Sequence, residues 1–158
     1  MKIELGFDSM PKYMALDLGS KTIGIATSQG IIVTPDKTVY FTRENYLEGV
    51  LKLKKEIEDI KPEVLVVGYP YNMDGTTGPR IEMVELIINL ILEHTNIKED
   101  QIKRVDERMT TRMANDIMTE LGISKDKRKQ KKDTMAAVLI LETHLEEEKK
   151  QHGKAPVN

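Results

Sequence analysis

Three acidic side chains are placed where they could carry out hydrolytic chemistry. Asp17 ends a short apolar run, Glu107 follows a later apolar segment, and Asp133 is expected to open the last helix. An acid inside an apolar strand is costly to bury unless it is paired or binds a cation. Three carboxylates brought together offer the hard oxygen ligands that Mg²⁺ or Mn²⁺ prefers. Two such ions about 4 Å apart would activate a water molecule and stabilise the leaving oxygen in phosphodiester hydrolysis.

Each of these acids also has a purely structural interpretation. Asp17 could hydrogen-bond only the turn that follows it, Glu107 could be a surface charge at a strand end, and Asp133 could be a helix cap. Adjacent strand residues face opposite ways, so only one of Asp106 and Glu107 can point into a given site. The small side chain of Ala137, one turn after Asp133, would let the last helix lie close to a sheet and turn that carboxylate toward the strand ends.

Hydrophobic periodicity predicts the elements that must position these acids, in the order β-β-β-α-β-α-β-α-α. The five expected strands cover residues 13–17, 22–28, 38–42, 64–67 and 101–106. The expected helices cover residues 44–60 and 80–95, a segment from Thr110 or Thr111 to Gly122, and residues 133–149. An antiparallel start followed by alternating elements predicts an α/β fold, a five-stranded mixed sheet flanked by helices. Active sites of open sheets lie near the carboxyl ends of strands.

Prolines and apolar stripes sharpen these expectations. Pro35 is expected in the connection before the third strand, Pro62 stops the first helix, and Pro79 suits the first position of the second. That second helix carries two apolar stripes, so we expect it to bury a second face against another helix or another subunit.

The composition limits the class of protein. The chain has 158 residues, 39% hydrophobic and 32% charged, which fits one ordinary folded domain. It has no cysteine, which excludes a disulfide-stapled secreted domain and a cysteine-ligated zinc site. It shows neither a signal peptide nor a membrane-spanning run, so a cytoplasmic protein is expected. We expect a domain over 13–150, an N-terminal extension over 1–12 and a disordered tail over 151–158.

The net charge of −2 argues weakly against nucleic-acid binding, but the charge is unevenly distributed. Six basic residues lie close together in one short segment and form a local basic patch: Lys125, Lys127, Arg128, Lys129, Lys131 and Lys132. We expect a loop here, which either grips a phosphate backbone or is merely solvated. His94, His144 and His152 show no metal-ligand spacing and are expected at the surface.

Four motifs in order make a more specific case. They are MALDLGSKTIG at 14–24, VGYPYNMDG at 67–75, VDERMTT at 105–111 and DTMAA at 133–137. With these motifs the chain resembles, over roughly residues 13 to 145, the YqgF family of RuvC-like Holliday junction resolvases and pre-16S rRNA nucleases. Tyr69 and Tyr71 stand where the family pattern favours aliphatic residues. Ala136 and Ala137 occupy the region where resolvases of the RuvC type carry a second acid.

The resemblance implies an RNase H-like fold and a nuclease that uses Mg²⁺ or Mn²⁺, with two ions expected. Asp17, Glu107 and Asp133 fall on the family's catalytic positions. We expect nucleic acid to contact Lys21, Arg80, Arg108 and the basic segment, and a phosphate to meet the backbone N–H groups of residues 75–78. Precursor ribosomal RNA is the favoured substrate and a four-way DNA junction the alternative. A monomer and a homodimer both remain open.

Two functions of other classes compete with a nuclease. The Asp17-Leu18-Gly19 hairpin resembles the phosphate loop of actin-like sugar kinases and ATPases, but those need two related domains, and 158 residues leave no room for the second. A non-catalytic nucleic-acid-binding module would not need the full set of acids that this chain retains. Calorimetric titration with Mg²⁺ separates these classes.

Overall fold

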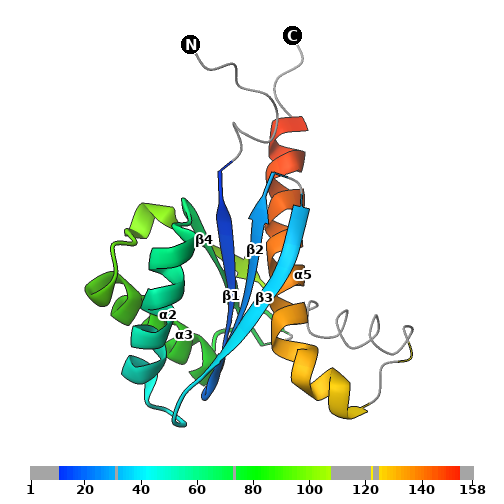
Figure 1. Ribbon diagram of the computed structural model, residues 1–158. Coiled ribbons are helices and arrows are strands. Elements are labelled where there is room, and N and C mark those ends of the chain that lie inside the picture. The colour runs from blue at the N-terminus through cyan, green and yellow to red at the C-terminus, as the bar shows by residue number, and fades with distance from the viewer. Residues whose placement is uncertain (1–10, 31, 73, 108–121, 123–124, 154–158) are drawn as a thin grey trace.

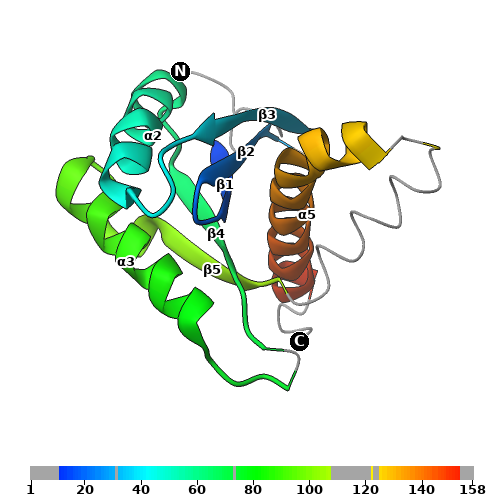
Figure 2. The same cartoon turned by 90° about the horizontal axis from the view of Figure 1, so that it is seen from below.

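A five-stranded sheet in the order β3-β2-β1-β4-β5 forms the centre of the molecule. The computed structural model describes residues 11–30, 32–72, 74–107, 122 and 125–153, with only the backbone for 125–132 and 151–153. Helices α2 and α3 cover one face of the sheet and helix α5 covers the other (Figures 1 and 2). None of the described helices is long and apolar enough to cross a membrane.

The antiparallel half of the sheet begins with the predicted hairpin. Strands β1 (Tyr13–Leu18) and β2 (Thr22–Gln29) are joined by a tight turn in which the N–H of Gly19 donates to the carbonyl of Thr22 at 2.8 Å. Strand β3 (Ile32–Tyr40) pairs with β2 at the sheet edge.

Strand β3 starts earlier than predicted and contains Pro35, so assigning that proline to a connection was wrong. An edge strand tolerates a proline, which lacks the N–H of the ladder, and a register shift between Gly24 and Ala26 lies directly opposite.

The parallel half comprises β4 (Val64–Tyr69) and β5 (Ile102–Asp106), with β4 pairing to β1. Helix α2 (Tyr46–Ile60) begins where the side chain of Asn45 accepts the N–H of Glu48 at 3.2 Å, and it ends at Lys61 with φ 54°. Helix α3 (Pro79–His94) starts at the predicted proline, and a 3-10 turn, η1 (Glu99–Gln101), precedes β5.

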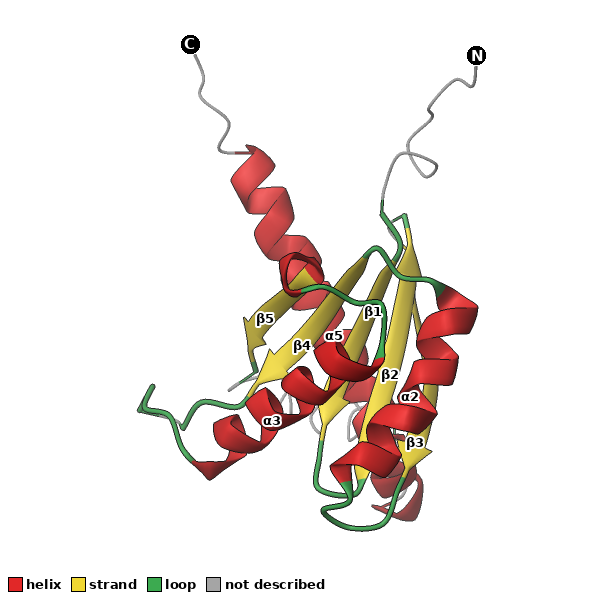
Figure 3. Ribbon diagram, turned by 90° about the vertical axis from the view of Figure 1, so that its left-hand side faces the viewer, coloured by secondary structure: helices red, strands yellow, loops and turns green. Residues whose placement is uncertain are grey.

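Helix α3 buries the first of its apolar stripes in the core under α2 and α3. The buried residues are Ile81, Val84, Ile87, Ile88 and Ile91. From the second stripe, Met83 and Leu90 pack partly buried against the same core, and Leu86 is 47% exposed. Helices α2 and α3 pack side by side (Figure 3), so of the two expected partners, another helix or another subunit, the structure shows a helix beside α3.

The two faces of β1 belong to two different cores. Met14, Leu16 and Leu18 point into the core under α2 and α3, whereas Tyr13 and Ala15 point into the core under α5. Fully burying an aliphatic side chain contributes about 1.5–3 kcal/mol, so both layers are held firmly. Strand alternation therefore continues the α5-facing row from Ala15 to residue 17.

Helix α5 (Lys125–Gly153) begins much earlier than predicted. The basic segment is not a loop, because its backbone forms the first turns of this helix, which lie to the side of the strands in Figure 1. Lysine, arginine and glutamine are strong helix formers, so a helix needs no apolar face there. Asp133 consequently lies inside the helix, about two turns from its start, and cannot be the helix cap.

The other predicted segments fall mostly outside the described residues. That holds for the helix ending at Gly122, for residues 1–10 and for residues 154–158. Helix α5 extends through residue 153, three residues into the expected tail.

Candidate active site at the carboxyl ends of the strands

Asp17 lies near the carboxyl end of β1, half-buried, on the face that α5 covers. Its partner across the hairpin is Gly24. A Cβ at Gly24 would overlap the backbone carbonyl of Asp133 and lie 2.9 Å from its Cβ. Because glycine has no side chain, α5 can press directly onto β2 here. Asp133 is thereby brought onto the sheet beside Asp17.

Glu107 is held on the opposite flank of Asp17. Its N–H donates to the carbonyl of Tyr69 at 3.1 Å, which continues the ladder between β4 and β5 by one residue. A Cβ at Gly68 would overlap its Oε2 atom, so this carboxylate lies directly over Gly68. Leu16 pairs with Val67 in the parallel register, which makes Gly68 the neighbour of Asp17.

The acids therefore border one patch of sheet, with Asp17 between the carboxylate over Gly68 and the helix over Gly24. Within the described part of the chain, no three His, Asp or Glu side chains are already arranged as a metal-binding group. The backbone brings the acids together from β1, from the residue after β5 and from α5.

Asp106 and Glu107 face opposite sides of the sheet. Glu107 follows Val105 on the α5 side and is 7% exposed, whereas Asp106 is exposed on the side of Arg104. The alternation expected from sequence is present.

The surroundings of Glu107 disfavour its charged form. Burial raises the pKa of its carboxyl above the ordinary value, the positive charge of Arg80 opposes this, and the charge of Asp106 adds to it. A cation bound beside the carboxylate would reverse this balance, since opposite charge favours the ionised form. Three carboxylates bordering a patch floored by two glycines supply hard oxygen ligands, so the residues present fit a divalent ion in ligand chemistry.

Comparison with known sequences identifies the protein's relatives. A sequence model of the RuvX family, described as Holliday junction resolvase, matches residues 11–147. The chain belongs to the RuvX family. This is the YqgF family of the sequence resemblance, and it is a family of nucleases, so the predicted enzyme class is confirmed.

Curated relatives of this RuvX-family chain carry the description "Putative pre-16S rRNA nuclease". The protein of Mesoplasma florum is 47% identical over 142 residues, which are 89% of this chain and 100% of the relative. The protein of Mycoplasma capricolum is 42% identical over 86% of this chain and 96% of its own length, and that of Clostridium kluyveri is 39% identical over 85% and 96%.

Solved structures confirm the fold. Thermus thermophilus RuvC, solved in complex with a Holliday junction substrate, superposes with a TM-score of 0.52 over 83% of this chain and 92% of its own. A second T. thermophilus RuvC structure gives a TM-score of 0.50, covering 82% and 92%. The sequence identities are 12% and 11%. The predicted RNase H-like fold of this RuvX-family chain is thus confirmed, and such nucleases depend in general on divalent metal ions.

The basic residues expected to bind nucleic acid are only partly described in this RuvX-family chain. Lys21 is exposed in the β1–β2 turn, and Arg80, exposed in the first turn of α3, lies near enough for its charge to act on Glu107. Arg108 lies outside the described residues. The backbone of the basic segment runs directly into Asp133, with Lys129 one turn and Lys125 two turns earlier.

The surface prediction for His144 was wrong. His144 is 7% exposed, its ring lies edge-on to Tyr13 with centroids 5.6 Å apart, and its Nε2 lies 3.1 Å from Glu148. It follows Ile140 by one helical turn, so the apolar spacing of α5 already pointed to a buried position. His94 is partly exposed at the end of α3, and the side chain of His152 is not described.

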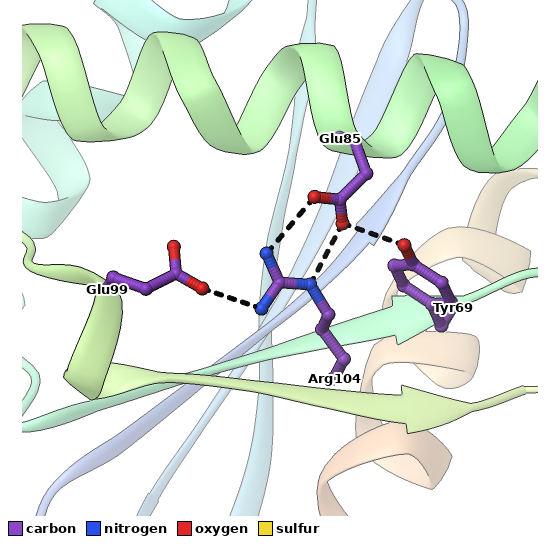
Figure 4. Close-up of polar contacts among 4 residues, drawn as sticks. All are labelled: Tyr69, Glu85, Glu99 and Arg104. Carbon is purple, nitrogen blue, oxygen red and sulfur yellow. Dashed lines mark hydrogen bonds and ion pairs between the residues drawn. The ribbon is translucent and has the colours of Figure 1, made fainter.

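A polar network behind the site was not predicted from sequence. Arg104 on β5 donates to both carboxylate oxygens of Glu85 on α3, at 2.9 and 3.2 Å, and to Glu99 at 2.9 Å (Figure 4). The hydroxyl of Tyr69 donates to Glu85 at 2.8 Å. The network links β4 and β5 to α3. Residue spacing does not predict it, because the interacting residues are far apart in the sequence.

Proposed function

We propose that this RuvX-family chain is a divalent-metal-dependent endonuclease that processes the 5′ end of precursor 16S rRNA. Asp17, Glu107 and Asp133 are its catalytic carboxylates in this proposal. The observation that carries it is the pair of close approaches at Gly24 and Gly68, which bring acids from three separate segments onto one patch of sheet. A non-catalytic nucleic-acid-binding module with the same fold would not need the close contacts at Gly24 and Gly68.

The three carboxylates would hold Mg²⁺ or Mn²⁺. Such ions supply an activated water and stabilise the leaving oxygen of the phosphodiester. A cation held there would favour the ionised form of Glu107, because its positive charge would offset the burial that raises the pKa of this carboxyl. Lys21 and Arg80, both exposed near this edge, neutralise the substrate's phosphates and hold its backbone.

Two observations favour RNA over a four-way DNA junction. The curated relatives are up to 47% identical over nearly their whole length, and their descriptions name precursor 16S rRNA as the substrate. In addition, Ala136 and Ala137 occupy the region of the second acid of RuvC-type resolvases, and both are buried. Because bacterial ribosomal RNA is transcribed and processed in the cytoplasm, this substrate also implies the cytoplasmic location expected from sequence.

Replacing Asp17 tests the proposal. Asp17→Asn keeps the shape of the side chain and removes the charge that would hold the metal. We expect cleavage of a labelled precursor 16S rRNA fragment to fall by at least about a hundredfold, a typical loss for a catalytic group, while the affinity for that RNA stays nearly unchanged.

A labelled four-way DNA junction, assayed in parallel with Mg²⁺ and with chelator, serves as the substrate control. Undiminished Mg²⁺-dependent cleavage by the Asp17 variant would refute the catalytic assignment. Faster cleavage of the junction than of the RNA by the wild-type protein would reverse the choice of substrate.

A further inference from the structure

Two tyrosines follow each other around the end of β4. The rings of Tyr69 and Tyr71 lie with centroids 5.2 Å apart and are tilted by 58°. Both line an open cavity of about 400 Å³, together with Gly75, Arg104, Asp106 and Glu147. That volume lies within the roughly 300–1,000 Å³ of small-ligand sites.

This cavity adjoins the proposed catalytic acids. The carbonyl of Tyr69 accepts the N–H of Glu107 at 3.1 Å, and Asp106, which lines the cavity, immediately precedes Glu107. A group bound against the tyrosines would therefore lie at the same strand ends as Glu107, on the other side of the sheet from the acid patch.

The ring of Tyr69 is held in place before any ligand arrives. Its hydroxyl donates to Glu85, and Glu85 is fixed by two hydrogen bonds from Arg104 (Figure 4). A wall that is already ordered loses little conformational entropy on binding, so a stacked ligand retains more of its contact energy.

The charges around the cavity disfavour a phosphate. Arg104 is engaged by Glu85 and Glu99, while Asp106 and Glu147 add negative charge. Aromatic walls with carboxylate acceptors suit a flat, neutral group that carries N–H donors. A nucleobase has such donors, as in the amino group of cytosine or adenine, and unpaired bases commonly stack on aromatic side chains.

We propose that Tyr69 and Tyr71 bind an unpaired nucleobase of the RNA beside the cleaved bond. A base inside a duplex cannot enter, since its faces and its pairing edge are already occupied. The cavity would thus select single-stranded RNA. This inference rests on the proposed nuclease function and names the part of the substrate that the chain reads.

Binding without metal separates this inference from catalysis. The probes are a fluorescein-labelled single-stranded RNA oligonucleotide and the same strand annealed to its complement, measured by anisotropy in chelator. Tyr71→Leu, which restores an aliphatic residue, should weaken single-strand binding about 5- to 150-fold, the value of one base–aromatic stack. Tyr71→Phe should bind as the wild type, and neither variant should change duplex binding.

An exposed tyrosine elsewhere provides the matched control. Tyr40, 62% exposed on β3, is not among the residues lining the cavity, so Tyr40→Leu should leave RNA affinity unchanged. Unchanged single-strand affinity in Tyr71→Leu, or an equal loss for single strand and duplex, would overturn the inference. Either outcome would leave the proposed nuclease function standing, because Mg²⁺-dependent cleavage tests that function separately.

A second measurement changes the RNA as well as the protein. Each base of the oligonucleotide is replaced in turn by an abasic nucleotide. One position near the cleavage site should lose affinity by the factor seen for Tyr71→Leu, and that RNA should be insensitive to the variant. Equal affinity at every position would overturn the inference.

Discussion

At the scale of single residues, two glycines decide whether the acids can meet. Gly24 allows the backbone of α5 at Asp133 to contact β2, and Gly68 makes room for the carboxylate of Glu107. Neither role requires unusual backbone angles, because each depends only on the missing side chain. The sequence motifs contain both glycines, but their purpose is visible only once helix and strand are seen in contact.

We predict that Gly24→Ala displaces α5 from β2. The added methyl group would overlap the Asp133 carbonyl, and overpacking of this kind costs about 1–3 kcal/mol. The melting temperature should fall by about 2–4 °C for each kcal/mol, and cleavage should be lost because Asp133 moves. Gly78→Ala is the control, since its methyl group would meet only the side-chain amide of Asn72, at 3.3 Å. A fully active Gly24 variant would contradict the close approach.

Strand alternation yields a sharper prediction about adjacent acids. Glu107 is buried beside the acid patch, and Asp106 is exposed on the other face. Glu107→Gln should therefore reduce cleavage by at least about a hundredfold, whereas Asp106→Asn should retain most of it. Single-turnover rates on the same RNA measure both. A greater loss in the Asp106 variant would reverse the assignment.

At the scale of elements, the periodic segments were predictable and the charged ones were not. The two helices on one face and the central strands were predicted to within about two residues, because burial on a defined face imposes a period on the sequence. The start of α5 was missed since its first turns carry no apolar pattern, only residues that are good helix formers. Pro35 was misplaced because an edge strand relaxes the rule against proline.

The helical start of α5 changes what the basic segment can do. Its charges are spaced along the same rigid element as Asp133 rather than carried on a loop. We predict that replacing Lys127, Arg128 and Lys129 together with alanine weakens RNA binding alike for all sequences. The slope of log K against log salt should fall by about 0.7 to 0.9 for each phosphate that the variant no longer neutralises.

Alanine is the best helix former, so this triple variant should keep α5 intact. The control replaces Lys149 and Lys150, which are exposed near the other end of the same helix. Removing those charges should leave the salt slope unchanged. An unchanged slope in the triple variant would identify the segment as a solubilising surface.

At the scale of the whole molecule, α5 is fastened at one end of the sheet and carries the proposed chemistry at the other. The hydroxyl of Tyr13 donates to Glu148 at 2.6 Å, and burial together with this bond raises the pKa of Tyr13. His144 packs against the same ring. The sequence predicted the layers of the fold from element order alone. It could not predict this buried polar anchor, which links the first strand to the last helix.

The acid patch should make the stability of the whole fold depend on pH and metal together. Burial raises the pKa of Glu107 in the folded state above its unfolded value, so its contribution favours folding at low pH and is lost as the pH rises through the folded pKa. Metal-free protein should therefore melt at a lower temperature at pH 8 than Glu107→Gln, which carries no charge to bury. A ligand that binds only the folded state stabilises it, so Mg²⁺ should raise the melting temperature of the wild type at pH 8. The rise should be smaller at pH 5, and Mg²⁺ should hardly change the melting temperature of the Glu107→Gln variant.

Scanning calorimetry at both pH values, with Mg²⁺ and with chelator, measures all of these differences. Equal stabilisation of both proteins by Mg²⁺ would show that the ion binds elsewhere, and a metal-free wild type that outlasts the variant at pH 8 would show that Glu107 is stably ionised without it.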